Sequence, residues 1–197
     1  MTARPRRTLV LASTSPFRRE LMQRLGITFE TMAPDVDETR QQNEDPDALV
    51  LRLSEAKACA GAGEYPDALI IGSDQVAVCG NEVLGKPGNH NAACAQLARL
   101  SGQQVNFLTG LCLYDAASGN ALLDLIPYRV TFRQLSAQQI DRYLKIEQPY
   151  NCAGSFKSEG LGISLFESMQ GEDPNALIGL PLIRLTSWLN ESGIDIP

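Results

Sequence analysis

The chain has 197 residues and a formal net charge of −6, with 44% hydrophobic and 20% charged residues. This composition is typical of a folded soluble protein with a sizeable core, and it argues against disorder. The acidic balance argues against bulk nucleic-acid binding, because that function needs a basic surface.

The first part of the chain predicts strands that alternate with helices. A short apolar run at residues 8–12 is typical of a buried strand, and a Ser/Thr/Pro turn follows it. The next expected elements are a helix from residue 16 to about 25, a strand at 27–33, an acidic loop at 34–46, a helix near 46–60 and an apolar strand at 68–72. The last of these strands leads directly into Ser73-Asp74-Gln75.

The second part predicts a hairpin, further helices and a glycine-rich loop. The expected elements are a turn at residues 79–81, a helix at 91–100, a long antiparallel pair at 104–114 and 121–133, a helix from Ser136 to about 147, a loop at 151–162 and a helix from about 181 to 192. There are no repeats and no flexible linker. The pattern therefore predicts a mixed α/β chain, residues 1–197 forming one domain of two lobes that share a cleft.

Cysteine usage and hydrophobic runs bear on the compartment. The five cysteines are widely spaced without a C-x-x-C pair, and His90 is the single histidine. This pattern argues against a zinc site or a disulfide framework and favours a reducing compartment. The first apolar run is too short for a signal peptide, and no run approaches the length of a membrane span. We therefore expect a cytoplasmic protein without a membrane partner.

The first predicted helix carries positive charge at its positive end. Ser15-Pro16 is typical of an N-cap followed by a first helical residue. The first turn of a helix usually collects Asp and Glu because of the helix dipole, but Arg18 and Arg19 stand there instead. Either the two arginines project into solvent, or the turn binds an anion through free N–H groups, hydroxyls and guanidinium groups.

Three lysines favour the anion site. Lys57 lies in a largely apolar helix, Lys86 lies in a tight Leu-Gly-Lys-Pro turn, and Lys157 lies in the glycine-rich loop. Each alone is usually solvated, but together with the arginines they predict a polyphosphate pocket. The chain lacks G-x-x-x-x-G-K-[ST], so this pocket is not a P-loop.

Carboxylates accompany these cations. Asp74 follows the predicted strand 68–72 at its carboxyl end, where open α/β sheets bind ligands. Glu38 lies in the acidic loop, which by itself would be an ordinary solvated segment. Paired across a cleft, Glu38 and Asp74 would hold a hard divalent cation such as Mg²⁺ or Mn²⁺. Cations for phosphates and carboxylates for a metal are what phosphoanhydride cleavage requires.

A set of ordered motifs resembles a known family. The chain resembles the Maf family of nucleoside triphosphate pyrophosphatases from Leu9 to about Leu189. The motifs that carry the resemblance are, in order, STSPFRRELM, VDET, EAKA, GSDQV, LGKP and DPNALIGLP. The resemblance implies a two-lobed Maf/inosine-triphosphatase-like α/β fold with a central mixed sheet and a nucleotide cleft. It implies release of pyrophosphate with a divalent metal as cofactor. A homodimer is expected from the family analogy alone.

The resemblance also implies roles for individual residues. Asp74 would be the proton acceptor and, with Glu38, a metal ligand. The triphosphate would be bound by Ser13, Ser15, Arg18, Arg19, Lys57 and Lys86.

Three departures from the commoner family pattern concern the nucleotide base. Phe17 replaces an arginine, Gln75 replaces a threonine, and Glu159 replaces a glutamine. Together they resemble the branch that acts on 7-methyl-GTP. Methylation at N7 makes guanine cationic, so Phe17 could stack on it, Glu159 could accept its N–H groups and Gln75 could adjust the fit.

Two alternatives stay open at this point. One is a pyrophosphatase for dTTP and UTP, or for a broad range of nucleotides, which a substrate panel would distinguish. The other is a septum-formation inhibitor that acts through protein contacts, because Maf proteins are associated with that effect. A septation block that persisted in Asp74→Asn would favour the second alternative.

Overall fold

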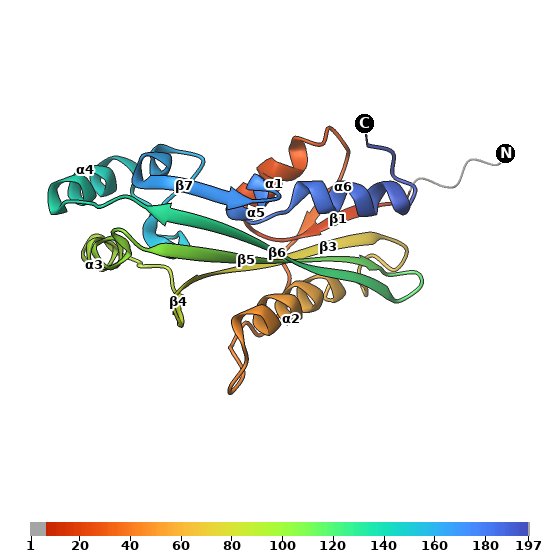
Figure 1. The fold of residues 1–197 in the computed structure, drawn as a ribbon. Helices are drawn as coiled ribbons and strands as arrows, with labels where there is room; N and C mark the ends of the chain where they lie inside the picture. Colours follow the sequence, from red (N-terminus) through yellow and green to blue (C-terminus); the bar gives the residue numbers. More distant parts are fainter. Residues whose placement is uncertain (1–6, 197) are drawn as a thin grey trace.

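A mixed sheet organises the computed structural model, which describes residues 7–196 (Figure 1). Its strands in the described part of the chain are β1 (Leu9–Ala12), β2 (Glu30–Met32), β3 (Leu69–Cys79), β4 (Glu82–Leu84), β5 (Gln104–Asp115), β6 (Asn120–Phe132) and β7 (Phe166–Gly171). The order is β2-β1-β3-β5-β6-β7, with β4 paired to β3. β1 pairs in parallel with β2 and β3, and the other pairs are antiparallel.

Helices cover both faces of this sheet. They are α1 (Pro16–Gln23), α2 (Pro46–Cys59), α3 (His90–Leu100), α4 (Ala137–Glu147), α5 (Pro174–Ile178) and α6 (Leu182–Glu191), with 3-10 turns η1 (Ala153–Ser155) and η2 (Leu161–Leu165). Figure 1 shows α2 on one face, α1, α5 and α6 on the other, and α3 and α4 at one end. The mixed α/β fold with helices around a central mixed sheet is therefore confirmed.

Local sequence signals account for several element boundaries. Ser15 caps α1, its Oγ accepting the N–H of Arg18 at 3.4 Å. Ser136 and Gln139 form a reciprocal capping box at the start of α4. Gly80 adopts a positive φ of 59° in the turn between β3 and β4, a conformation that glycine adopts without a steric penalty. The expected caps and this hairpin are therefore confirmed.

The structure corrects the expected end of the third strand. β3 continues to Cys79, because β5 pairs with it from Leu69↔Asp115 through Val78↔Asn106. Asp74 therefore lies in the middle of a strand rather than after its carboxyl end. Both β7 and α5 were missing from the sequence prediction, because one is an exposed edge strand and the other is very short.

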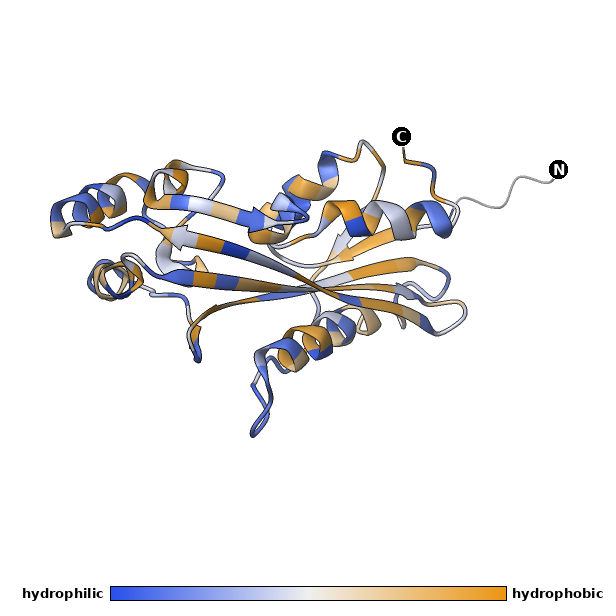
Figure 2. Cartoon of the chain, in the orientation of Figure 1, coloured by the Kyte–Doolittle hydropathy of each residue, from blue (hydrophilic) through white to orange (hydrophobic). Residues whose placement is uncertain are grey.

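Hydrophobic residues gather around the sheet in separate clusters. Figure 2 shows hydrophobic stretches along the central strands and hydrophilic residues in the loop that precedes α2. One cluster packs α1 and α6 against β1 and β3, a second joins α3 and α4 to the ends of β5 and β6, and a third lies under α2. Because β5 contributes to all three clusters, it links them; the division into two lobes stays a prediction.

Two glycines let α2 lie unusually close to the sheet. A Cβ on Gly72 would come within 2.7 Å of the Ala58 backbone nitrogen and closer still to the Ser54 carbonyl oxygen. A Cβ on Gly110 would come within 2.5 Å of Ser54 Oγ. This close approach brings the side chain of Lys57 against β3.

None of the helices between residues 7 and 196 is both long enough and apolar enough to cross a bilayer.

Candidate functional site

A cavity of about 860 Å³ lies beside the centre of the sheet. The turn before α1, the helix α2, the strand β3, the segment around Lys86, the loop at 148–159 and α5 all contribute to its walls. It brings together most of the side chains predicted from the sequence, namely Ser13, Ser15, Phe17, Arg18, Glu38, Lys57, Asp74, Gln75, Lys86 and Glu159.

Arg19 is the exception among the predicted site residues. It is exposed and is not among the residues that line the cavity. Successive side chains on a helix point about 100° apart; Phe17 and Arg18 line the cavity, whereas Arg19, at the next position, is turned out of it. In this structure only Arg18 therefore faces the site.

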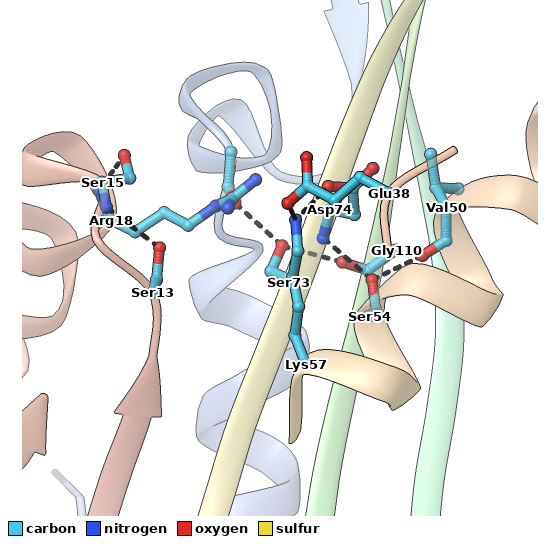
Figure 3. A network of polar contacts seen from close by, with 11 residues as sticks. Ser13, Ser15, Arg18, Glu38, Val50, Ser54, Lys57, Ser73, Asp74 and Gly110 are labelled. Atoms are coloured by element: carbon cyan, nitrogen blue, oxygen red, sulfur yellow. Dashed lines mark hydrogen bonds and ion pairs between the residues drawn. The ribbon is translucent and has the colours of Figure 1, made fainter. Parts of the chain in front are cut away.

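Lys57 joins the two predicted metal ligands. Its Nζ lies 2.6 Å from Asp74 Oδ1 and 2.7 Å from Glu38 Oε1 (Figure 3). Lys57 is 6% exposed and Asp74 is 9% exposed, whereas Glu38 is on the rim of the cavity. The hydrogen bond from Lys57 lowers the pKa of Glu38 below its usual value, with smaller contributions from the charges of Lys86 and Arg18. Both carboxylates therefore converge on one cation.

The backbone of Asp74 is tied to α2 as well. The Asp74 N–H donates to Ser54 Oγ at 2.9 Å, and Ser54 Oγ donates to the Val50 carbonyl at 2.6 Å. Ser54 is fully buried, and Figure 3 shows it between the helix and the strand. The sequence analysis assigned Ser54 no role, because its partner is separated from it by 20 residues and is visible only in the fold.

Arg18 is oriented by the carbonyl of Gly179, the residue that follows α5. Its Nε donates to the Gly179 carbonyl at 2.8 Å, and the hydroxyl of Ser73 donates to the same carbonyl at 2.9 Å. Figure 3 shows the guanidinium extending from α1 towards the carboxylates of Asp74 and Glu38. Burial lowers the pKa of Arg18, while those two carboxylates raise it. The side chain is thus held in place with its terminal nitrogens towards the charged part of the cavity.

The turn that precedes α1 has the geometry of an anion site. Ser13 Oγ accepts the Ser15 N–H at 3.2 Å, and Ser15 caps the helix. The first turn of α1 has no acidic residue. The positive end of the helix dipole therefore faces the cavity without a negative side chain of its own to compensate it.

Gln75 holds α5 in place. Its amide nitrogen donates to Thr109 Oγ1 at 2.9 Å, to the Ala176 carbonyl at 2.6 Å and to the Leu177 carbonyl at 3.1 Å. Thr109 Oγ1 also donates to the Ala176 carbonyl, at 2.8 Å. The donors of Gln75 are therefore committed to the protein, and Gln75 shapes the cavity by positioning α5.

Asp173 fixes the segment that carries Gly179. Asp173 is only 2% exposed, and its Oδ1 accepts the Asn175 N–H at 2.8 Å while its Oδ2 accepts the Ile183 N–H at 2.7 Å. One carboxylate thus caps α5 and the start of α6 together. The motif DPNALIGLP was visible in the sequence, but its role in orienting Arg18 was not.

Aromatic side chains form another wall of the cavity. Phe107 and Phe156 both line it, and their rings meet edge to face with centroids 5.3 Å apart. Phe156 also packs edge to face against Phe132 and Phe166. Phe17 lines the cavity from α1 and is half-buried. The sequence analysis identified Phe17 and missed the two phenylalanines of the wall.

The carboxylates of Glu38 and Asp74, which surround Lys57, fit a divalent cation whose other ligands would come from the substrate. In residues 7–196 no group of three or more His, Cys, Asp or Glu side chains forms a metal cage. Mg²⁺, however, is commonly held by one or two carboxylates together with substrate phosphates. Because the ammonium group of Lys57 already occupies the point where Glu38 and Asp74 converge, that point favours positive charge.

The sequence of the chain is similar to those of known proteins. The family model described as Maf-like protein matches residues 8–192. The 7-methyl-GTP pyrophosphatase of Alcanivorax borkumensis is 56% identical over 190 residues, which cover 96% of each chain. The enzymes of the same name from Nitrosococcus oceani and Pseudomonas putida are 57% and 54% identical, over 96% of this chain and 95% and 98% of theirs.

Proposed function

The chain belongs to the Maf family, and from that premise we propose that it is a nucleoside triphosphate pyrophosphatase whose substrate is 7-methyl-GTP. Water attacks the α-phosphorus, the bond to the bridging oxygen breaks, and 7-methyl-GMP and pyrophosphate are formed. The observation that carries the proposal is the buried Lys57, held at 2.6–2.7 Å by Asp74 and Glu38 inside the cavity.

Cationic and hydrogen-bonding groups would hold the triphosphate. Arg18, Lys57 and Lys86 supply positive charge, and the Ser13–Ser15 turn supplies hydroxyl and N–H groups at the start of α1. These groups would offset the charge that develops on the leaving pyrophosphate. Arg19 is exposed and does not line the cavity, so we leave it out of the proposed site.

Asp74 is the proposed proton acceptor. Its carboxylate is held by Lys57 and its backbone by Ser54, so it is fixed on both sides before substrate binds. A carboxylate fixed in this cavity can accept a proton from the attacking water as the bond to phosphorus forms. Because Lys57 has three donors, it can remain on Asp74 and still contact a phosphate oxygen.

A divalent cation, Mg²⁺ or Mn²⁺, is the proposed cofactor, and Glu38 and Asp74 would hold it. When bound, it supplies Lewis-acid stabilisation of negative charge on the phosphates. Glu38 and Asp74 supply the negative charge that binds the cation. Arg18 and Lys86 line the same cavity and supply positive charge to the phosphate oxygens.

The base would be recognised through its charge. Phe17 presents an aromatic side chain to the cavity and Glu159 presents a carboxylate at its rim, and both favour a cationic ring over a neutral one. Gln75 would contribute indirectly, because its amide nitrogen is bonded to Thr109 and α5.

Replacing Glu159 with glutamine tests this charge recognition. We expect the ratio of kcat/KM for 7-methyl-GTP over GTP to fall roughly three- to tenfold, mainly through the KM for 7-methyl-GTP, since only that base is cationic. Steady-state pyrophosphate release with both nucleotides measures the ratio. Glu191→Gln, an exposed change in the last turn of α6, is the matched control. An unchanged ratio in Glu159→Gln would show that its charge does not select the base.

A substrate panel tests the proposed function itself. Purified protein is incubated with Mg²⁺ or Mn²⁺ and equal concentrations of 7-methyl-GTP, GTP, dTTP and UTP, and pyrophosphate release is measured. We expect 7-methyl-GTP to be hydrolysed fastest. Faster hydrolysis of dTTP or UTP would agree with the proposed phosphate site but would contradict the proposed base specificity.

We further propose that the protein is cytoplasmic, binds no nucleic acid and, from the family analogy, forms a homodimer.

A further inference from the structure

The loop that carries Glu159 is fastened to the end of α4 by Glu147. Lys157 Nζ lies 3.0 Å from the Glu147 carbonyl oxygen and 3.3 Å from Glu147 Oε1. The second carboxylate oxygen, Oε2, accepts the Leu161 N–H at 2.8 Å. Glu147 therefore contacts the loop on both sides of Glu159, and this contact holds that residue at the rim of the cavity.

The ammonium group of Lys157 is paired in a sheltered place. The side chain of Glu147 is 17% exposed and that of Lys157 is 28% exposed. The Glu147 carbonyl belongs to the last turn of α4, where the helix dipole also favours a cation. The Lys157 N–H donates to the Tyr143 hydroxyl at 3.1 Å, and burial raises the pKa of Tyr143 well above its usual value, so that the phenol adds no negative charge.

This pairing changes the interpretation of Lys157. The sequence placed Lys157 among the cations of a polyphosphate pocket, and it does line the cavity. In the structure its charge is instead directed at Glu147 and the end of α4. The loop therefore presents one carboxylate that has no cationic partner within the described residues, namely that of Glu159, which accepts a hydrogen bond from the Ser158 hydroxyl at 3.3 Å.

We propose that Glu147 is a specificity-determining positioning residue, which neutralises Lys157 so that Glu159 alone sets the charge that the nucleotide base meets. The inference rests on the proposed function, because it assigns Glu147 to the selection of a cationic, N7-methylated base. Without Glu147, Lys157 would be an unpaired cation two residues from Glu159 and would oppose a cationic base. A neutral guanine would be affected far less, since it carries no net charge.

Glu147→Gln is the first test. Glutamine keeps the shape of the side chain and an oxygen that can accept the Leu161 N–H, while it removes the charge that faces Lys157. We expect the KM for 7-methyl-GTP to rise roughly three- to tenfold and the KM for GTP to stay within about twofold. A purely structural role would raise both KM values together, and that result would overturn the inference.

Changing Lys157 provides the second test. In the double variant Glu147→Gln with Lys157→Met no cation is left unpaired, so we expect the KM for 7-methyl-GTP to return towards the wild-type value. Lys157→Met alone should lower that KM or leave it as it is, and this variant decides the question if Glu147→Gln does not fold. A rise in the KM for 7-methyl-GTP in Lys157→Met, or no recovery in the double variant, would overturn the inference.

The design separates this inference from the proposed function. A wild-type protein that does not prefer 7-methyl-GTP over GTP would contradict the proposed function, whatever Glu147 does. The change in the two KM values caused by Glu147→Gln is measurable with either preference. Glu191→Gln, which removes an exposed carboxylate at the end of α6, should leave both KM values unchanged.

Discussion

Replacing Asp74 with asparagine is expected to lower kcat for pyrophosphate release about 10²- to 10⁴-fold, which is the usual range for loss of a general base. Asparagine fits the same space and leaves the backbone N–H that donates to Ser54. It cannot accept a proton at neutral pH, and it leaves Lys57 with only the more exposed Glu38 as a charged partner. Pyrophosphate release with 7-methyl-GTP at saturating concentration measures the effect.

The control for this variant is Asp124→Asn. Asp124 also pairs with a cation at short range, 2.8 Å from Arg184 Nε, but it lies outside the large cavity. We expect Asp124→Asn to retain wild-type kcat. Thermal unfolding of both variants shows whether each is folded at the assay temperature. A folded Asp74→Asn protein with wild-type kcat would remove Asp74 from the chemistry and require another proton acceptor.

Replacing Gly72 with alanine is expected to reduce both stability and activity. The new Cβ would lie within 2.7 Å of the Ala58 nitrogen and even closer to the Ser54 carbonyl, so α2 would have to move away from β3. Overpacking of this kind typically costs about 1–3 kcal/mol of unfolding free energy. Lys57 lies between those two contacts on α2, so its Nζ would shift relative to Asp74, and a displacement of about 1 Å can cost roughly 100-fold in rate.

Urea unfolding and kcat should be measured on the same preparations of Gly72→Ala. Gly63→Ala is the matched control, because nothing lies within 4 Å of a Cβ at Gly63 and its φ is not positive. We expect the control to change stability by less than about 0.5 kcal/mol. Wild-type stability and wild-type rate in Gly72→Ala would show that the close approach of α2 is not needed to place Lys57.

Local patterns in the sequence determined most of the elements. The period of apolar residues predicted the strands at the centre of the sheet, and Ser15 and Ser136 predicted helix starts, because a cap is made by residues three positions apart. The long hairpin of β5 and β6 was predicted from two extended runs around a turn. These features depend on neighbours in the chain, and so they are visible without the fold.

The ordered motifs also predicted the family, and the match over residues 8–192 confirms it. They indicated the residue types that the site needs: a cation, a carboxylate and an aromatic ring. The same motifs could not show which way each side chain points. Arg18 lines the cavity and Arg19 does not, because α1 presents Phe17 and Arg18 to the cavity and turns the next position towards solvent.

The tertiary structure alone decided which groups hold the site residues. Asp74 lies in the middle of β3 because β5 pairs with that strand along nearly its whole length, with Gly110 of β5 opposite Asp74. Gln75 donates to α5 and Lys157 pairs with Glu147, whereas the sequence analysis expected Gln75 to adjust the fit of the base and Lys157 to join the cations of a polyphosphate pocket. Lys157 and Glu147 are 10 residues apart in the chain, and Gln75 and Leu177 are 102 residues apart. No local sequence pattern shows that such residues are in contact. Hydrogen bonds and ion pairs require atoms within about 3–4 Å, and only the folded chain brings such distant residues that close.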